Sequence, residues 1–372
     1  MTPCGLWASF PAADCLRNMR QGRLSGGTED ALSASIGYAR QPRDPDPGKR
    51  VMRRFELQSR VLRLSGALIG ALTLGTLTNA PVHAQSWVTD SVCPDDAHLD
   101  FHRCALRAAR NYDPPRTVDG VPDMQGIWRR RGAMHESLQA HPRTIDDAGG
   151  TSGVVDPADG FVPIQDWAEA KRRHNRPAYV HHNAICRLSG VPVTMYMTGT
   201  YQFMQIPGTF FIQGEESHAF RTVPLDDRKH IGEDIKLWNG DSIGRWEGNT
   251  LVIETRNQAA KSWLDQRGRF FTDEAVVNER FTMIDANTIH YQATIEDPNV
   301  FTRPFTIATA YRRSTVESFE VWEEACHENN DFAKQQFLNV GYEIYPGITG
   351  EEARRLSAAW DLGEAELEEL GR

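Results

Sequence analysis

Three closely spaced polar residues of the chain could carry out acid–base chemistry: Glu215, His218 and Arg221. A histidine can take up a proton, a carboxylate can fix its tautomer, and an arginine can hold an anionic or carbonyl oxygen. In a regular strand Glu215 and Arg221 share one face and His218 lies on the other, so a bulge near Gly214 or Ser217 is needed to bring them together. We predict an acid–base site here, with a structural, hydrogen-bonding role for His218 as the alternative.

A fourth candidate catalytic residue is a carboxylate within an apolar strand. Val276–Ile284 alternates as a strand does, and Glu279 shares a face with Val277, Phe281 and Met283. A carboxylate on an apolar face must be paired, protonated or facing a cavity. Glu279 is therefore expected to be an acid or base in a cavity. The alternatives are an ion pair with a distant arginine, or a position on an outer face.

The stretch 236–265 interleaves tryptophans with charged residues and predicts a ligand-binding region. Ile243–Glu247 and Thr250–Arg256 predict a hairpin, because Gly248 and Asn249 between them tolerate the positive φ of a tight turn. The tryptophans are numerous enough either to line an apolar cavity or to fill a barrel core. The candidate ligand-binding residues are Trp238, Asp241, Arg245, Trp246, Trp263 and Asp265.

Signatures of other chemistry are weak after residue 84. This part of the sequence contains no P-loop or G-x-G-x-x-G motif. The letters of a hydrolase G-x-S-x-G block occur once, at Gly240-Asp241-Ser242-Ile243-Gly244, but they precede a hairpin instead of a strand-to-helix elbow. This part also contains no C-x-x-C pair for zinc or haem. A three-ligand site from Glu215, His218 and His230 is the alternative. We expect no metal and no cofactor.

The chain becomes β-rich after residue 190. Short alternating segments separated by turn residues predict about nine or ten antiparallel strands, and closing such a sheet removes its exposed edges. We predict a mainly β protein with a lipocalin-like (calycin-type) barrel over 191–330 and short flanking helices. The segment 85–190 is expected to lead into the barrel and 331–372 to form a helical tail. The strands include Thr194–Met197, Tyr201–Ile206, Thr209–Gln213, His218–Val223, Thr288–Glu296, Phe305–Arg312 and Val316–Glu324; the helices include 95–112, 164–174 and one begun by a capping box at Thr349.

The N-terminal part of the chain predicts export. Met52-Arg53-Arg54 is followed by the uncharged run Leu64–Leu77 and by Val82-His83-Ala84, which has the small residues of a cleavage site. We therefore predict a signal peptide over 52–84, cleaved after Ala84 in a periplasmic or secreted protein. Residues 1–51 are interpreted as a disordered, over-extended start. The apolar run is too short for a stable membrane span.

The composition after residue 84 limits the partners. This part has 30 Lys and Arg against 44 Asp and Glu, a formal charge of −14, which disfavours nucleic acid and anionic membranes. An exported chain with four cysteines indicates disulfides. Of the three possible pairings we expect Cys93 with Cys104 and Cys186 with Cys326.

Several motifs together resemble a family of exported bacterial proteins from proteobacteria and acidobacteria without an assigned function. They lie at 115–128, 205–230, 238–255, 279–298 and 323–330, and the W-x-G-D-S-x-G-R-W-E-G block begins at Trp238. In that family's pattern a Glu, a His and an Arg recur at Glu215, His218 and Arg221, an aromatic–Asp pair at Trp263 and Asp265, and a Cys-x-Glu-Asn at Cys326, Glu328 and Asn329. The family usually has Asp where this chain has Asn249, and a Cys-Leu-Pro type segment at Cys186-Arg187-Leu188. The resemblance implies an exported β-rich protein.

These observations predict an exported protein that binds a small apolar or aromatic organic molecule. Cofactor-free acid–base catalysis, of a lyase, isomerase or hydrolase type, would use the four catalytic candidates. The alternatives are a non-catalytic carrier with the same pocket and a structural envelope protein with a filled barrel.

Overall fold

The structure is a computed structural model of the 372-residue chain. The chain divides into two units, Met1–Ala84 and Gln85–Arg372. The structure describes residues 90–361 apart from 133, 146–147, 317–318, 325 and 327–329. The predicted signal peptide, its cleavage site and residues 1–51 therefore lie outside the described residues, as do Glu328, Asn329 and the end of the C-terminal tail.

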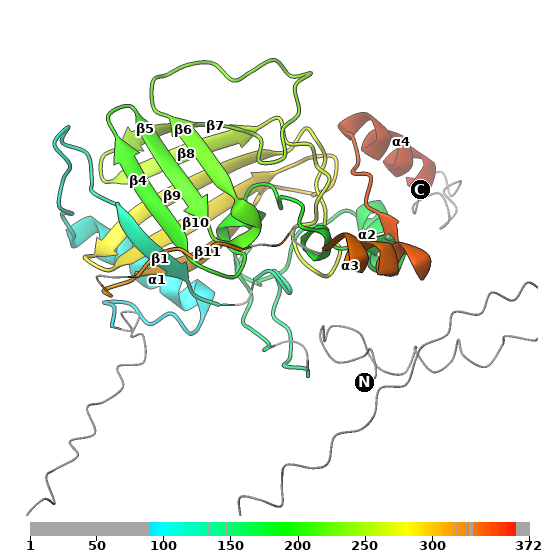
Figure 1. Cartoon of the computed structure of the whole chain (residues 1–372), viewed down its shortest axis with the longest axis horizontal. Helices are drawn as coiled ribbons and strands as arrows, with labels where there is room; N and C mark the ends of the chain where they lie inside the picture. The colour runs from blue at the N-terminus through cyan, green and yellow to red at the C-terminus, as the bar shows by residue number, and fades with distance from the viewer. Residues whose placement is uncertain are drawn as a thin grey trace, which may run out of the picture. The chain divides into compact units, whose positions relative to one another are not determined.

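One antiparallel sheet forms the centre of the second unit (Figure 1). Its main path has the order β6-β5-β4-β1-β11-β10-β9-β8-β7, with β2 paired to β11 beside that path. Most neighbours along the path are also neighbours in the sequence, and tight turns connect the pairs β4–β5, β7–β8 and β9–β10. The strands are β1 Gly126–Arg130, β2 Val154–Asp156, β4 Tyr201–Ile206, β5 Thr209–Gly214, β6 Phe220–Pro224, β7 Asp241–Glu247, β8 Thr250–Arg256, β9 Val276–Asp285, β10 Thr288–Glu296 and β11 Phe305–Arg313.

The two end strands of the sheet, β6 and β7, lie side by side and nearly close a barrel. Arg221 Nη2 on β6 donates a hydrogen bond to Ser242 Oγ on β7 at 3.1 Å. Gly244 on β7 allows this approach, because a Cβ there would come within 2.9 Å of Val223 and 2.7 Å of Leu225. Side chains therefore form the contact between β6 and β7. The prediction of a mainly β, antiparallel barrel is confirmed, and its calycin type stays a prediction.

The inside of the barrel holds a cluster of aromatic side chains, called the aromatic core below. The Phe203 ring lies 5.5 Å from Phe210, 5.7 Å from Phe281 and 5.8 Å from Tyr311 between ring centroids. Aromatic pairs at such distances add about 0.5–1.5 kcal/mol to the effect of burial. These rings fill the section of the barrel that they occupy. The aromatic core consists of Trp128, Tyr201, Phe203, Phe210, Phe281, Tyr291 and Tyr311, each at most 2% exposed.

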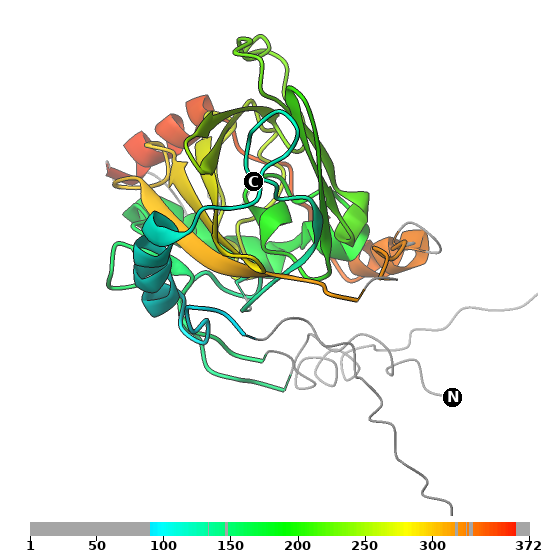
Figure 2. The same cartoon turned by 90° about the vertical axis from the view of Figure 1, so that its left-hand side faces the viewer.

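Short helices surround the barrel. Phe101 and Ala105 of α1 pack against Ile284 and Ala310, so α1 covers the outside of β9 and β11 (Figure 2). No helix in the described residues is long and apolar enough to cross a membrane. The helices are α1 His98–Ala108, α2 Asp166–Ala178, α3 Asn330–Asn339 and α4 Gly350–Asp361, with the 3₁₀ turns η3 Ala109–Asn111, η4 His182–Ile185, η5 Val193–Met195 and η6 Glu216–His218; β3 Tyr179–Val180 and β12 Glu343–Ile344 form a separate parallel pair.

Two predicted strands are wrong. Residues 314–316 and 319–324 follow β11 and do not form the predicted strand. A hairpin partner would have to pair with the side of β11 that faces away from β10, and β1 and β2 already occupy that side. The predicted strand Thr194–Met197 contains the turn η5 instead. Thr194 N donates to Gly190 O and Met195 N donates to Pro192 O, so local turns use the groups that a strand would offer to a neighbour.

The predicted capping residue of α4 is present and can be tested. Glu352 N donates to Thr349 Oγ1 at 3.1 Å, and α4 buries Ala353 and Leu356 behind this cap. We expect T349A to lower the free energy of unfolding by about 1 kcal/mol, because one amide of the first turn loses its acceptor. T349S keeps the hydroxyl and serves as the control in urea denaturation. Equal losses in both variants would contradict a capping role.

Candidate functional site

The predicted catalytic residues Arg221 and Glu279 meet inside the barrel. Arg221 Nη2 lies 2.6 Å from Glu279 Oε2, and Nη1 lies 3.1 Å from Oε1. Tyr291 Oη donates to Glu279 Oε1 at 3.0 Å, and Arg221 Nη2 also contacts Thr255 Oγ1. The two side chains are 3% and 0% exposed. Glu279 therefore forms an ion pair with an arginine 58 residues away, which was one of the alternatives expected for it.

The other two predicted catalytic residues lie in the connection between β5 and β6. Glu215 Oε2 accepts hydrogen bonds from Thr200 N and Thr200 Oγ1, both at 2.7 Å. His218 is exposed. The turn η6 forms here with positive φ at Ser217 and His218, 55° and 49°. The carboxylate of Glu215 therefore binds Thr200 and not Arg221. The expected bulge near Gly214 or Ser217 is replaced by the 3₁₀ turn η6.

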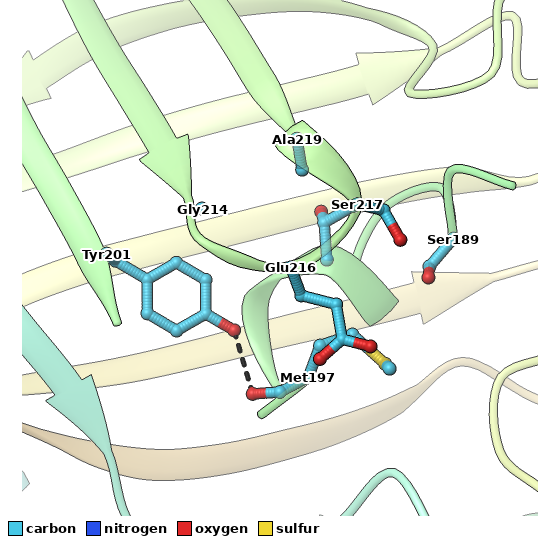
Figure 3. Close-up of a pocket in the computed structure, with 8 residues that line it drawn as sticks. Ser189, Met197, Tyr201, Gly214, Glu216, Ser217 and Ala219 are labelled. Atoms are coloured by element: carbon cyan, nitrogen blue, oxygen red, sulfur yellow. Dashed lines mark hydrogen bonds between the residues drawn. The ribbon is translucent and has the colours of Figure 1, made fainter. Parts of the chain in front are cut away.

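A small pocket adjoins this connection (Figure 3). Ser189, Glu216 and Ser217 border it, and Tyr201 Oη at its edge donates to Met197 O at 3.0 Å. Its volume of about 10 Å³ matches a single water molecule. The pocket is too small for an organic ligand in this conformation.

A much larger hollow lies on the outer face of β7, β8 and β9 and is called the outer groove below. It has a volume of about 740 Å³. The loop between β6 and β7 lies along it, and that loop rises above the barrel in Figure 1. Charged side chains of both signs predominate in the lining of the groove, with a few apolar side chains among them. The lining side chains include Lys229, His230, Ile243, Arg245, Glu254 and Val276.

Asp241 organises the loop beside the outer groove. It accepts hydrogen bonds from Arg228 Nη2 at 2.6 Å and from Ile231 N at 3.1 Å, and it lies 2.7 Å from His230 Nδ1. Burial acts to raise the pKa of Asp241. The hydrogen bonds from Arg228, His230 and Ile231 outweigh it, so this pKa is lowered and the carboxylate stays ionised.

The second nitrogen of His230 faces another carboxylate. His230 Nε2 lies 3.2 Å from Glu254 Oε1 on β8. Arg256 Nε donates to the same oxygen at 2.7 Å. The hydrogen bond and charge of Arg256 lower the pKa of Glu254 despite its partial burial, and His230 adds to that effect. His230 therefore lies between two ionised carboxylates at the wall of the outer groove, an arrangement that can hold and transfer a proton.

The predicted ligand-binding residues are divided between several places. Arg245 lines the outer groove, and Asp241 holds the loop beside it. The Trp238 ring lies under Arg187, 5.6 Å from its Cζ. Trp246 alternates with Arg245 on β7 and packs against the core instead of lining the groove.

Trp263 and Asp265 are buried outside the outer groove. The Trp263 ring contacts His181 and Tyr345 at 5.5 and 5.8 Å between centroids. Asp265 accepts from Leu138 N at 3.0 Å and from Arg269 Nη1 at 2.5 Å. These contacts place Asp265 in a structural network that fixes the surrounding loops.

Sequence reasoning missed His230 and Glu254 as a pair. His230 was considered only as a metal ligand with Glu215 and His218, and Glu254 only as a strand residue. The register of the hairpin carries the missing signal: Asp241 lies opposite Arg256, and Ile243 lies opposite Glu254. This register places Asp241 and Glu254 on the outer face of the same hairpin. No group of three or more His, Cys, Asp or Glu able to hold a metal ion occurs in the described part of the chain.

Both expected disulfides are confirmed. Cys93 bonds to Cys104 of α1, and Cys186 bonds to Cys326 across 140 residues. Near the second disulfide, the Glu324 carboxylate accepts a hydrogen bond from Ser217 N in η6. Two disulfides are typical of a protein outside the reducing cytoplasm.

The comparisons with known proteins give a limited result. No family model and no curated protein sequence matches the chain. A secretary abundant heat soluble protein from Ramazzottius varieornatus is 10% identical, with a TM-score of 0.23 over 51% of this chain and 95% of that chain. A mutant of the fluorescent protein UnaG is 14% identical, with a TM-score of 0.21 over 42% of this chain and 99% of that chain. The assignment of a barrel rests on the strand order and on the contact between β6 and β7.

Proposed function

We propose that this protein binds a small organic molecule in the outer groove. The observation that carries the proposal is the volume of about 740 Å³, which lies within the range of 300–1,000 Å³ usual for ligand sites. The aromatic core occupies the inside of the barrel. The barrel then acts as a rigid scaffold, and its outer face together with the β6–β7 loop forms the binding surface.

Charged side chains outnumber apolar ones in the lining of the outer groove, which favours a molecule that has several polar or charged groups beside an apolar or aromatic part. Ile243 and Val276 offer apolar contacts, while Arg245 and Glu254 offer charged hydrogen-bonding groups of both signs. Charged groups placed beside apolar contacts fix the orientation of a ligand. The acid–base role of Glu215, His218, Arg221 and Glu279 stays a separate prediction. It would be withdrawn if alanine variants at Glu215 and His218 left ligand turnover unchanged.

We also propose that the protein is periplasmic or secreted after cleavage behind Ala84. The disulfides support a location outside the cytoplasm. The intact mass of protein exported by its own host tests the cleavage site. A mass that includes any of residues 52–84 would contradict it.

A variant that fills the outer groove tests the binding proposal. Val276 lies on the groove side of β9, whereas Val277 points into the barrel. We expect V276W to weaken binding of aromatic fragments at least tenfold, because the indole occupies the ligand volume. Ligand-observed NMR with a fragment library measures this, and V276A is the matched control. Fragments that bind V276W as well as the unchanged protein, or a library without any binder, would contradict the proposal.

A structural envelope protein is the second candidate function. The aromatic core favours it, because a barrel filled by its own side chains needs no ligand for stability. Binding at the outer groove separates the two candidates, since a purely structural protein would bind none of the fragments.

A further inference from the structure

The unusual feature of the outer groove is an imidazole with a carboxylate at each nitrogen. His230 comes from the β6–β7 loop, Asp241 from the start of β7 and Glu254 from the middle of β8. The His230 side chain is 19% exposed, whereas that of Asp241 is 7% exposed. The ring is therefore held from behind by Asp241 and remains accessible from the groove.

Asp241 determines which ring nitrogen of His230 carries the permanent proton. The Asp241 carboxylate is ionised and can only accept hydrogen bonds. At 2.7 Å from Asp241 Oδ2, His230 Nδ1 must therefore be the donor. Arg228 and Ile231 hold the carboxylate at this position through separate hydrogen bonds. The hydrogen bond at one nitrogen of a histidine fixes the tautomer, so Nδ1–H is retained and Nε2 is the nitrogen that gains or loses a proton.

Glu254 faces the second ring nitrogen of His230 at the wall of the outer groove. Glu254 is ionised beside Arg256, so an unprotonated Nε2 would direct its lone pair at an anionic oxygen. The contact of 3.2 Å is favourable only as Nε2–H donating to Glu254 Oε1. Nε2 therefore lies at the surface of the outer groove, where a proton can pass between it and a bound molecule. The charged groups that contact the ring are Asp241 from β7 and Glu254 from β8. Arg228 from the loop binds Asp241, Arg256 from β8 binds Glu254, and Lys229 also lines the groove.

We propose that His230 is the proton-transfer residue of the outer groove and that Asp241 is its positioning residue. The proposal rests on the proposed function, because it requires a molecule bound in the groove. As an acid, His230 breaks its Nε2–H bond and gives the proton to an oxygen or nitrogen of the ligand, keeping the electron pair. As a base, neutral Nε2 uses that pair to take a proton from a C–H, O–H or N–H group. Asp241 takes no proton in either direction. The ligand class is an organic molecule with such a weakly acidic or basic group.

The first test measures the tautomer in the free protein. Long-range ¹H–¹⁵N correlation NMR distinguishes the two nitrogens of each histidine, and H230Q identifies the signal by its loss. We expect neutral His230 to carry its proton on Nδ1, and E254Q to keep this form because the amide can donate to Nε2. In D241N we expect the proton to shift towards Nε2. Neutral His230 protonated at Nε2, or the same tautomer in D241N, would overturn the proposal. A free-protein measurement does not depend on whether fragments bind.

The second test uses 5-nitrobenzisoxazole, a small aromatic probe of bases. A base removes its ring C–H proton, the electron pair forms the nitrile, and the N–O bond breaks to release a coloured cyanonitrophenolate. We expect the rate of H230Q to be at least tenfold lower than that of the unchanged protein. H174Q, a histidine substitution on α2 outside the groove, is the control. An H230Q rate equal to that of H174Q would overturn the proposal, while fragment binding tests the groove itself independently.

Discussion

R221M is expected to lower the free energy of unfolding by about 3–5 kcal/mol, because it leaves Glu279 buried without its countercharge. The two side chains are paired at 2.6 Å and almost fully buried. Tyr291 remains as a neutral donor to Glu279 and cannot replace the charge. Urea denaturation followed by tryptophan fluorescence measures the loss.

Two control variants separate the ion pair from general damage. R280M removes an arginine that is next to Glu279 in the sequence. Arg280 Nη1 lies 2.8 Å from Oε2 of Glu247, and the Glu247 side chain is 39% exposed. Exposed pairs of this kind contribute about 0–1 kcal/mol. The double variant R221M/E279L replaces both charges with apolar groups and should regain most of the lost stability. A loss of less than about 1 kcal/mol in R221M, or no recovery in the double variant, would show that the pair is not the source of the effect.

Lowering the pH from 7 to 5 is expected to destabilise the protein through three buried histidines. Burial lowers the pKa of His98 to about 4, with Arg130 adding to the effect, and that of His290 to about 3, with His102 adding to it. Burial and the neighbouring His181 also lower the pKa of His182. Between pH 6.5 and these values the unfolded chain binds more protons than the folded one, so the free energy of unfolding falls as pH falls. His98 and His290 each contribute about 2 kcal/mol to the loss at pH 5, and His182 acts in the same direction.

Urea denaturation at pH 7, 6 and 5 measures the free energy of unfolding at each pH. Its slope against pH gives the number of protons that the chain takes up on unfolding. We expect H290Q to remove about one proton from that number below pH 6, whatever it does to stability at pH 7. H174Q replaces a histidine that is only partly buried on α2 and is the matched control. A pH dependence that is the same in H290Q and in the unchanged protein would contradict the prediction.

Much of the barrel could be predicted from the sequence, because its hairpins depend on local patterns. The turn at Gly248 and Asn249 and the alternation around Glu279 fix the β7–β8 and β9–β10 pairs without tertiary information. The neighbours of β11 could not be predicted in this way. β1 pairs with β11 across about 180 residues of sequence, and no local pattern signals a pairing of this kind.

The candidate site was harder to predict than the fold. Glu279 could be recognised as an anomaly on an apolar face, but its partner Arg221 lies on a strand at the other end of the sheet order. The contact between them depends on barrel closure. His230 lies in a loop without regular structure, so its position relative to Glu254 follows from the contacts of Asp241 and from no periodic pattern.

The contact between β6 and β7 also affects how this protein behaves at high concentration. An open sheet presents two edges whose free amides and carbonyls can recruit strands from other molecules. Here the two terminal strands of the main sheet path face each other, and Gly244 brings their side chains into contact. Neither strand offers a long, flat template to a second molecule. Near-closure of the barrel thus protects the chain against edge-to-edge aggregation.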